Sequence, residues 1–380
     1  MSFALLRSLD RWLGAFFLYL LALPMRLVAL LPRRHEARPR YVFLKLKGGG
    51  SLIIALPMLL GLRRKHPEAE FILVCAREAR IYAELTGIFD RLLLIDDSSL
   101  ACLIASGWRA LHRAFRASLC IDLEPNSLLA GVFTMLSAAR QRIGLVRPEM
   151  PMRAAAYTSA LPINPAAPIY IYYDQIAATL NAPLAAAGDC RAPLLSHLPP
   201  PPAGKLPGRT LGIVAFTSDF APERMMPAAT WAALLKKEKE IPARLYIFGS
   251  KDNRAAAQIL ADALRPALPA CEIIDISGSY SLAQSAAMLA ACDEIWAVDS
   301  GLLHMTRALG VPNRSFWGPT MPSQRLRPID GLREEARYRP FICSPCVQAS
   351  GQPPCGGHNL CMISMAEENP NLHPAWVQKQ

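Results

Sequence analysis

The turn Asp299-Ser300-Gly301 combines residue types that suit an anion-binding site. It follows the apolar, β-prone residues 295–298 and precedes apolar residues at helical spacing, which predicts a buried strand, a turn and a helix. Asp and Ser favour helix N-caps, and Gly lets a ligand approach the backbone. Because a helix N-terminus offers free N–H groups and a positive dipole end, the turn predicts a phosphate site. His304, one helical turn further on, would contact a phosphate or a hydroxyl, or would pack in the core.

Polar or small residues also follow two other predicted strands in the second half of the chain. They are Thr217, Ser218, Arg224 and Gly249. Hydroxyls and a guanidinium at a strand end suit diphosphate oxygens, although each residue alone would also serve an ordinary loop or cap. Their recurrence at successive strand ends, together with the turn at 299–301, predicts a diphosphate site.

A glycine-rich turn, Gly48-Gly49-Gly50-Ser51, follows the first predicted strand. Gly49 and Gly50 would let another molecule come close to the backbone, or would simply form a tight βα turn. The turn fits neither the dinucleotide-binding fingerprint, whose spacing fails at Ile53, nor the P-loop, which requires G-K-[ST]. A nucleotide-cofactor oxidoreductase is therefore disfavoured.

Two carboxylates, Asp122 and Glu124, end another predicted strand in the first half. A carboxylate at the carboxyl end of a strand can act as a general base. The alternative is that these residues cap the turn at Pro125.

Four cysteines near the C-terminus form the pattern Cys343-x2-Cys346-x8-Cys355-x5-Cys361. This spacing is compatible with a structural Zn²⁺ site, two disulfides, buried thiols or, less well, an iron–sulfur cluster. The other six cysteines are scattered through apolar or helical stretches, which favours a reducing compartment.

The elements that position these residues alternate between strand and helix in both halves, which is typical of parallel sheets covered by helices. Strands are predicted at 41–46, 71–74, 91–95, 118–123, 211–216, 244–248, 272–276, 294–298 and 314–317. Helices are predicted at 52–65, 100–117, 127–139, 174–184, 228–240, 254–264, 282–291 and 302–309. The fold class is therefore α/β, with two Rossmann-like domains that face a cleft.

The predicted domain organisation has five parts. They are an N-terminal segment at 1–40, a first Rossmann-like domain at 41–197, a proline-rich linker at 198–209, a second Rossmann-like domain at 210–340 and a cysteine-containing segment at 341–380.

The N-terminal segment is apolar but short of a membrane span. Residues 12–25 carry no charge, Arg26 interrupts the pattern, and Arg33, Arg34, Arg38 and Arg40 follow. Because a spanning helix needs about 20 apolar residues, we expect an in-plane, peripheral or monotopic anchor on the cytoplasmic face of the inner membrane, with arginines at anionic headgroups. The alternative is an apolar helix that docks on the protein's own domain.

The net charge of +11 fits phosphorylated small molecules and an anionic membrane surface. Nucleic acid is not an expected partner, because the chain lacks an RNA- or DNA-binding signature. With 52% hydrophobic and 19% charged residues, the chain has ample material for a folded core.

Three stretches together resemble glycosyltransferase family 9, the ADP-heptose:lipopolysaccharide heptosyltransferases. VDSGLLHMTRALGVPNRSFWGPT is similar to that family's nucleotide-sugar motif, ERMMPAATW to a segment with a phosphate-contacting basic residue, and PCGGHNLCM to a C-terminal cysteine segment found in many members. The resemblance spans residues 41–365. It implies that the diphosphate is cradled by Asp299, Ser300, Gly301 and His304, and that Arg224 contacts phosphate.

This resemblance also implies a GT-B fold and an inverting transfer that needs no metal or other catalytic cofactor. The donor would be a nucleotide-diphosphate sugar, ADP-heptose or similar, bound by the domain at 210–340. A lipid-linked glycan in lipopolysaccharide or surface-glycan synthesis would be the acceptor, bound by the domain at 41–197.

One position departs from the family pattern. The heptosyltransferases carry an Asp, the expected base, where this chain has Ser51. A serine of ordinary pKa cannot replace a carboxylate base. Either Asp122 or Glu124 substitutes, or the acceptor differs, or the chain is a non-catalytic member that binds nucleotide sugar or glycolipid as an assembly factor.

Overall fold

The computed structural model describes residues 3–32, 37–203, 207–217, 221–347 and 353–367. The chain divides into two compact units, Met1–Pro193 (unit 1) and Leu194–Gln380 (unit 2). The division falls inside helix α8 (Ala187–Ser196), a few residues before the proline-rich stretch at 198–209.

Unit 1 is built on a six-stranded sheet with the order β3-β2-β1-β4-β5-β6, and all of its pairings are parallel. The strands are β1 (Arg40–Leu44), β2 (Glu70–Cys75), β3 (Arg91–Leu94), β4 (Leu119–Asp122), β5 (Gln141–Val146) and β6 (Ser159–Pro162). The central strands β1, β2 and β4 are apolar and buried, as a sheet covered on both faces requires.

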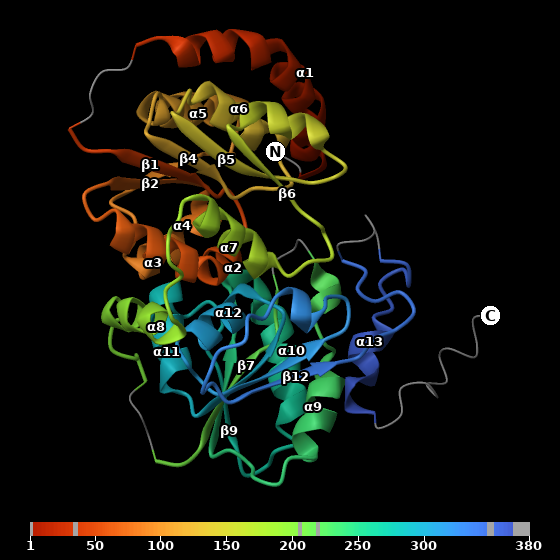
Figure 1. The fold of residues 1–380 in the computed structure, drawn as a ribbon. Coiled ribbons are helices and arrows are strands. Elements are labelled where there is room, and N and C mark those ends of the chain that lie inside the picture. Colours follow the sequence, from red (N-terminus) through yellow and green to blue (C-terminus); the bar gives the residue numbers. More distant parts are fainter. Residues whose placement is uncertain (1–2, 33–36, 204–206, 218–220, 348–352, 368–380) are drawn as a thin grey trace. The chain divides into compact units, whose positions relative to one another are not determined.

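Helices cover both faces of this sheet (Figure 1). On one face lie α5 (Leu100–Ala114) and α6 (Leu128–Leu136), with α1 (Phe3–Leu30) packed on the outer side of α6. On the other lie α2 (Gly49–Ile54), α3 (Leu56–Lys65), α4 (Arg77–Thr86) and α7 (Ile169–Thr179), and a short 3-10 helix, η1 (Pro151–Ala156), precedes β6. The single helix predicted at 52–65 is thus two helices, and it begins earlier, within the glycine turn.

Helix α1 packs on α6 along one face. Its fully buried Leu18 joins Leu128, Val132 and Met135 in an apolar cluster. A side chain at Gly14 would lie 2.4 Å from Leu128 Cβ, so only glycine permits this close approach. Asp10 also accepts hydrogen bonds from the backbone N–H groups of Leu128 and Leu129 at 3.0 Å each. This inner face is the docking on the protein's own domain that the sequence left as the alternative.

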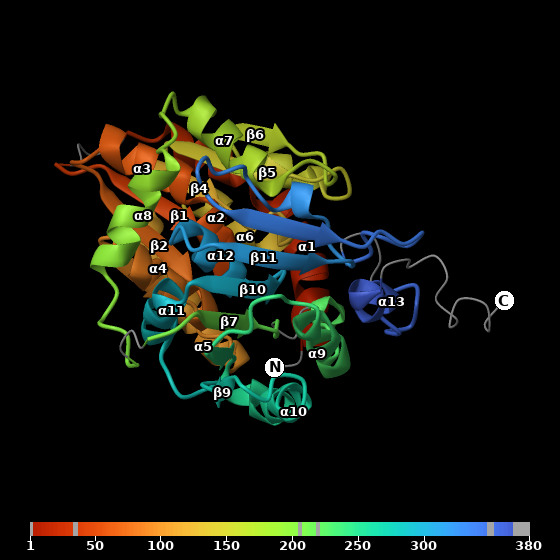
Figure 2. The ribbon, with the colours of Figure 1, turned by 90° about the horizontal axis from the view of Figure 1, so that it is seen from below.

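Unit 2 repeats the design with a second parallel sheet, whose order is β12-β11-β10-β7-β8-β9 (Figure 2). Its strands are β7 (Thr210–Val214), β8 (Arg244–Phe248), β9 (Glu272–Asp275), β10 (Glu294–Val298), β11 (Asn313–Trp317) and β12 (Glu334–Tyr338). Its helices are α9 (Ala228–Lys236), α10 (Arg254–Leu264), α11 (Leu282–Ala291), α12 (Gly301–Ala308) and α13 (Leu360–Ile363). Short 3-10 helices are η2 (Pro222–Arg224), η3 (Lys251–Asn253), η4 (Pro322–Gln324) and η5 (Ser364–Ala366).

The core of unit 2 includes the C-terminal segment. Trp231, Trp296 and Phe316 pack at its centre with aromatic contacts of 5.3 and 5.7 Å between ring centroids. Cys361 and Met362 of α13 belong to the same cluster. The described part of the cysteine-containing segment therefore completes the core of unit 2.

Candidate functional site

The turn after β10 has the predicted local structure. Ser300 is the N-cap of α12, and its side chain accepts a hydrogen bond from the backbone N–H of Leu303 at 3.3 Å. Gly301 opens the helix. Asp299, between strand and cap, is 3% exposed. The strand thus delivers a buried carboxylate to the amino end of a helix.

Arg224 and His304 hold Asp299 from two sides. Arg224 Nη1 donates to the Asp299 carbonyl oxygen at 2.9 Å and lies 3.6 Å from its Oδ2. His304 Nε2 lies 3.6 Å from Asp299 Oδ1. Burial alone would raise the pKa of Asp299, but His304, Arg224 and Arg325 outweigh it and lower that pKa well below its usual range. Asp299 is therefore a fixed anion that orients two potential ligand contacts.

His304 retains an unused polar atom. The ring is 7% exposed, and its Nδ1 has no hydrogen-bond partner among the described residues. Burial lowers the pKa of His304, and the neighbouring Asp299 offsets this only in part. In a neutral ring with Nε2–H directed at Asp299, Nδ1 is an acceptor, which suits a ligand hydroxyl.

Two further residues at this edge of the sheet escaped sequence reasoning. Thr320 follows β11, the strand paired with β10, and its buried Oγ1 has no partner among the described residues. Arg325 follows η4, and its charge acts on both Asp299 and His304. Only the tertiary fold brings them to the turn, although Thr320 is the last residue of the family-like motif at 298–320 and Arg325 lies five residues after it.

The remaining donor-site candidates lie at neighbouring strand ends. Thr217 Oγ1 donates to the carbonyl of Ala221 at 3.2 Å, in the loop that carries Arg224. Gly249 packs against its own unit, since a side chain there would lie 2.9 Å from Ser277 Cβ. Ser218 lies outside the described residues.

In unit 1, the glycine turn opens α2, with Gly48 in the left-handed region at φ 77°. Gly49 is required by packing, because a side chain there would lie 2.0 Å from the ring of Tyr82. Gly50 is buried. A side-chain carbon built on Gly48 would lie 3.4 Å from Ser51 Oγ and 3.9 Å from Lys45 Nζ. The hydroxyl and the ammonium group therefore border the same turn.

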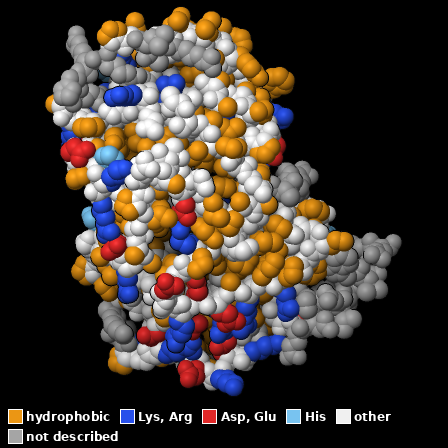
Figure 3. All heavy atoms as spheres, in the orientation of Figure 1, with side chains coloured by type: hydrophobic (Ala, Val, Ile, Leu, Met, Phe, Trp, Pro, Cys, Tyr) orange, Lys and Arg blue, Asp and Glu red, His pale blue; other side chains and the backbone are white. Residues whose placement is uncertain are grey.

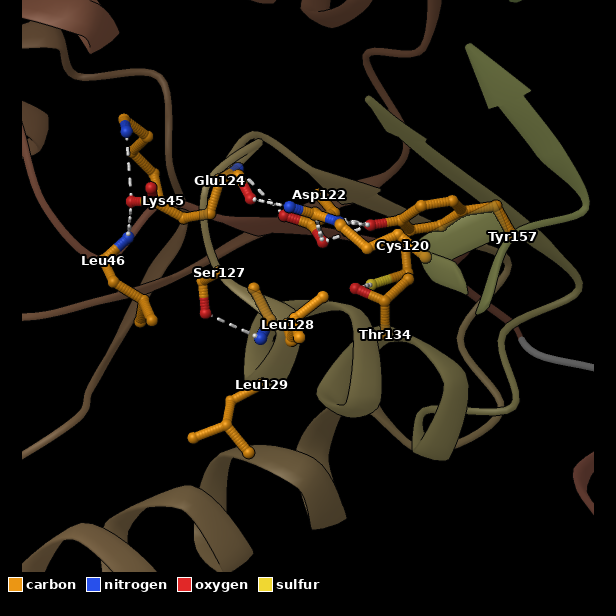
Figure 4. A network of polar contacts seen from close by, with 12 residues as sticks. Lys45, Leu46, Cys120, Asp122, Glu124, Ser127, Leu128, Leu129, Thr134 and Tyr157 are labelled. Carbon is orange, nitrogen blue, oxygen red and sulfur yellow. Dashed lines mark hydrogen bonds and ion pairs between the residues drawn. The ribbon is translucent and has the colours of Figure 1, made fainter. Parts of the chain in front are cut away.

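Glu124 belongs to this corner as well (Figure 4). Its Oε1 accepts from Lys45 Nζ at 3.0 Å and from the backbone N–H groups of Leu46 and Lys47 at 2.7 and 2.8 Å. No hydrogen bond to Oε2 is present within the part of the chain that the structure describes. Glu124 thus lies beside the position of Ser51, with one carboxylate oxygen fully engaged.

The surroundings of Asp122 argue against its prediction as a general base. It is fully buried, and its Oδ2 accepts from Arg153 Nη2 and from the Tyr157 hydroxyl, each at 2.7 Å (Figure 4). Its Oδ1 accepts from the backbone N–H of Glu124 at 2.8 Å. Burial raises the pKa of Asp122, against the opposing effects of Arg153 and Tyr157. A carboxylate so enclosed has no access to an acceptor hydroxyl and supports the loop that carries Glu124.

None of the four C-terminal cysteines, all of which the structure describes, forms a disulfide. Burial is the main cause that raises the pKa of Cys361 to about 12, and the three neighbouring cysteines add to it. However, the described residues, which include all four cysteines, contain no group of three or more His, Cys, Asp or Glu side chains arranged to hold a metal ion. Structural zinc at Cys343, Cys346, Cys355 and Cys361 stays a prediction from their spacing, and no step of the mechanism depends on it.

The two Rossmann-like units define the class of fold, which is that of the GT-B glycosyltransferases. The chain resembles a family 9 glycosyltransferase from Veillonella parvula, with a TM-score of 0.60 and 17% identity over 81% of this chain and 87% of that one. It also resembles the E. coli heptosyltransferase WaaC with ADP, with a TM-score of 0.60 and 18% identity over 86% and 97% of the two chains.

Sequence comparison then supplies the family. The model of glycosyltransferase family 9 (heptosyltransferase) matches residues 108–352, so the chain belongs to this family. Lipopolysaccharide heptosyltransferase 2 of E. coli K12 is 32% identical over 106 residues. That alignment spans 28% of this chain and 30% of the relative, so less than a third of the curated protein is matched.

Proposed function

We propose that this protein is an inverting glycosyltransferase that moves heptose or a related sugar from an ADP-linked donor to a lipid-linked acceptor in lipopolysaccharide synthesis. The observation that carries the proposal is the buried Asp299 held between Arg224 and His304 at the start of α12, in a chain of the heptosyltransferase family.

In this site the diphosphate would lie at the N-terminus of α12, where backbone N–H groups and the helix dipole favour an anion. Arg224 has Nε and Nη1 engaged by carbonyl oxygens, whereas no hydrogen bond from Nη2 occurs among the described residues. Nη2 is therefore available for a phosphate oxygen. His304 Nδ1 would accept a hydrogen bond from a donor hydroxyl.

Arg224→Met should weaken ADP binding by about 10- to 100-fold, the scale of losing a charge-assisted hydrogen bond. Isothermal titration calorimetry with ADP measures the change. Arg244→Met is the matched control, since Arg244 lies at the amino end of β8, whereas the candidate site lies at the carboxyl ends of the strands, and it should leave the affinity unchanged. Equal affinities for all three proteins would refute the donor site.

For the transfer step, we propose Glu124 as the base. The acceptor oxygen attacks the anomeric carbon while the bond to the diphosphate breaks. The diphosphate leaves with the bonding electrons, and the acceptor proton passes to the Glu124 carboxylate. The position of Glu124 beside Lys45 and the Ser51 turn supports this choice over Asp122.

Glu124→Gln should lower the transfer rate by about 100-fold or more, the usual contribution of a general base. Glu149→Gln, which changes an exposed carboxylate of the same unit, is the control. Ser51→Asp restores the carboxylate of the family pattern and should raise the rate. The measurement is ADP release from ADP-heptose with a lipopolysaccharide core acceptor.

The Ser51 departure favours a second candidate, a non-catalytic family member that binds nucleotide sugar or glycolipid as an assembly factor. ADP-heptose binding without transfer, in both the wild type and Ser51→Asp, would establish that alternative. Failure of donor binding as well would reject both candidates.

A further inference from the structure

The outer face of α1 is apolar and uncovered. The exposed side chains recur every three or four residues, opposite the face that packs on α6. They are Trp12, Phe16, Tyr19, Leu20, Leu23 and Leu27, between 56 and 75% exposed. The spacing shows one continuous stripe along the helix.

Helix α5 carries a second stripe. Its inner face is made of small buried residues, Ser106, Ala110 and Ala114. Its outer face presents Leu100, Ile104 and Trp108 at intervals of four residues, with exposures of 52, 63 and 69%. By contrast, α4 and α7 on the other face of the sheet expose one large apolar side chain each, Ile81 and Ile171.

Both stripes belong to the same side of unit 1. Helices α1 and α5 lie on one face of its sheet (Figure 1), and hydrophobic side chains gather along the edge that α1 forms (Figure 3). Arg116, just after α5, donates through Nη2 to the carbonyl oxygens of Leu31 and Pro32 at 2.7 Å each. These bonds fix the carboxyl end of α1 against the end of α5. We call the nine side chains of the two stripes the two-helix apolar surface.

The exposed charged side chains described on α1 and α5 are arginines, whereas two exposed carboxylates, Asp96 and Asp97, lie just before α5. Arg11 on α1 and Arg109 and Arg113 on α5 are exposed. Helix α5 contains no acidic residue, and Asp10 of α1 is engaged by α6. Aromatic side chains with a polar atom, such as Trp12, Tyr19 and Trp108, are the type that settles at a bilayer interface. An apolar stripe flanked by arginines complements an anionic lipid surface.

We propose that the two-helix apolar surface docks unit 1 flat on an anionic bilayer, with α5 as a second contact beside α1. No helix in the described part of the chain has the length and apolar content that a membrane crossing requires. Contact in the plane of the interface fits helices whose opposite faces are already packed on the domain. The proposal concerns binding alone and does not require the chain to transfer a sugar.

The test is flotation of the full chain with phosphatidylcholine vesicles that contain or lack phosphatidylglycerol, with no donor or acceptor present. The wild type should bind the anionic vesicles, and added salt or the absence of phosphatidylglycerol should weaken binding. The α1 variant Trp12→Ser/Phe16→Ser/Leu20→Ser and the α5 variant Ile104→Asn/Trp108→Ser should each lose about tenfold or more in partitioning, because each removes large apolar side chains.

The matched control is Ile259→Asn on α10 of unit 2, where Ile259 is 64% exposed against 63% for Ile104. It should bind as the wild type does. All replaced side chains are exposed, and unchanged circular dichroism and melting temperature confirm intact folds. In Trp108→Phe, quenching of tryptophan fluorescence by brominated lipid should fall.

Three results would overturn the proposal. The first is a wild type that does not float with anionic vesicles, and the second is an α5 variant that floats as well as the wild type. The third is a wild-type dimer that the α5 variant converts to a monomer with no loss of lipid binding, which would make this surface a contact between copies of the chain.

Discussion

Arg153 is a buried cation whose side-chain nitrogens all reach acceptors. Nε and Nη2 donate to the Tyr157 hydroxyl at 3.1 and 2.6 Å, and Nη1 donates to the carbonyl of Glu124 at 2.6 Å. Nη2 also pairs with Asp122. The arginine therefore links η1 to the end of β4 and fixes the loop on which Glu124 lies. The turn at Asp299 was predictable because its signal is local, whereas this pair joins residues 31 positions apart.

Arg153→Leu should destabilise unit 1 by about 3–5 kcal/mol, because it leaves Asp122 as a buried carboxylate without its cation. For a unit of this size the melting temperature should fall by roughly 10 °C. Differential scanning calorimetry measures the shift. Arg80→Leu breaks an exposed pair with Glu84 on α4 and should have little effect. A melting temperature of Arg153→Leu equal to that of Arg80→Leu would contradict this role.

At the scale of elements, α1 supplies the cap of another helix. Asp10 accepts from the Ser127 hydroxyl at 2.6 Å as well as from the first N–H groups of α6, while Ser127 itself caps Ala130. A carboxylate at a helix N-terminus satisfies free N–H groups and complements the dipole. This bond joins residues more than a hundred positions apart, so the sequence predicted α1 without its partner.

Asp10→Ala should loosen the docking of α1 and cost about 1 kcal/mol or somewhat more. Hydrogen exchange of the α1 amides should then accelerate by roughly tenfold, since local opening becomes easier. Exchange measured by mass spectrometry tests this. Asp97→Ala, at an exposed position before α5, is the control. Unchanged protection of α1 would show that its apolar face suffices for docking.

Three strands were not predicted from the sequence: β5, inside the sheet of unit 1, and the edge strands β6 and β12. β6 reads Ser-Ala-Leu-Pro and β12 reads Glu-Glu-Ala-Arg-Tyr, and each lies at the end of its sheet. These two edge strands lack the apolar run that identifies a central strand, whereas the edge strands β3 and β9 carry apolar residues and were predicted. The buried strands β1, β4, β7 and β10 were predicted within one or two residues, because burial on both faces requires continuous apolar sequence.

At the scale of the whole molecule, two units of similar design carry the candidate residues, with Ser51, Asp122 and Glu124 in unit 1 and the turn at Asp299 in unit 2. The family match at residues 108–352 covers the turn at Asp299 and the residues Asp122 and Glu124, but it begins after Ser51. The α/β class and the presence of two Rossmann-like units followed from the alternation of strand and helix patterns. The position of the boundary between the two units, inside α8, was not predicted from the sequence. A helix with Pro193 in its interior gives no clear signal of a domain boundary.

The docking of α1 has a consequence during synthesis. Leu18 leaves the ribosome long before Leu128, its partner on α6. At about 5–20 residues per second, roughly 5–20 s pass before that partner has been made. For this time the nascent chain has neither face of α1 covered by its own domain. During this time a bilayer or a chaperone close to the ribosome would have access to both faces of α1. Once unit 1 is complete, the face that packs on α6 is no longer accessible.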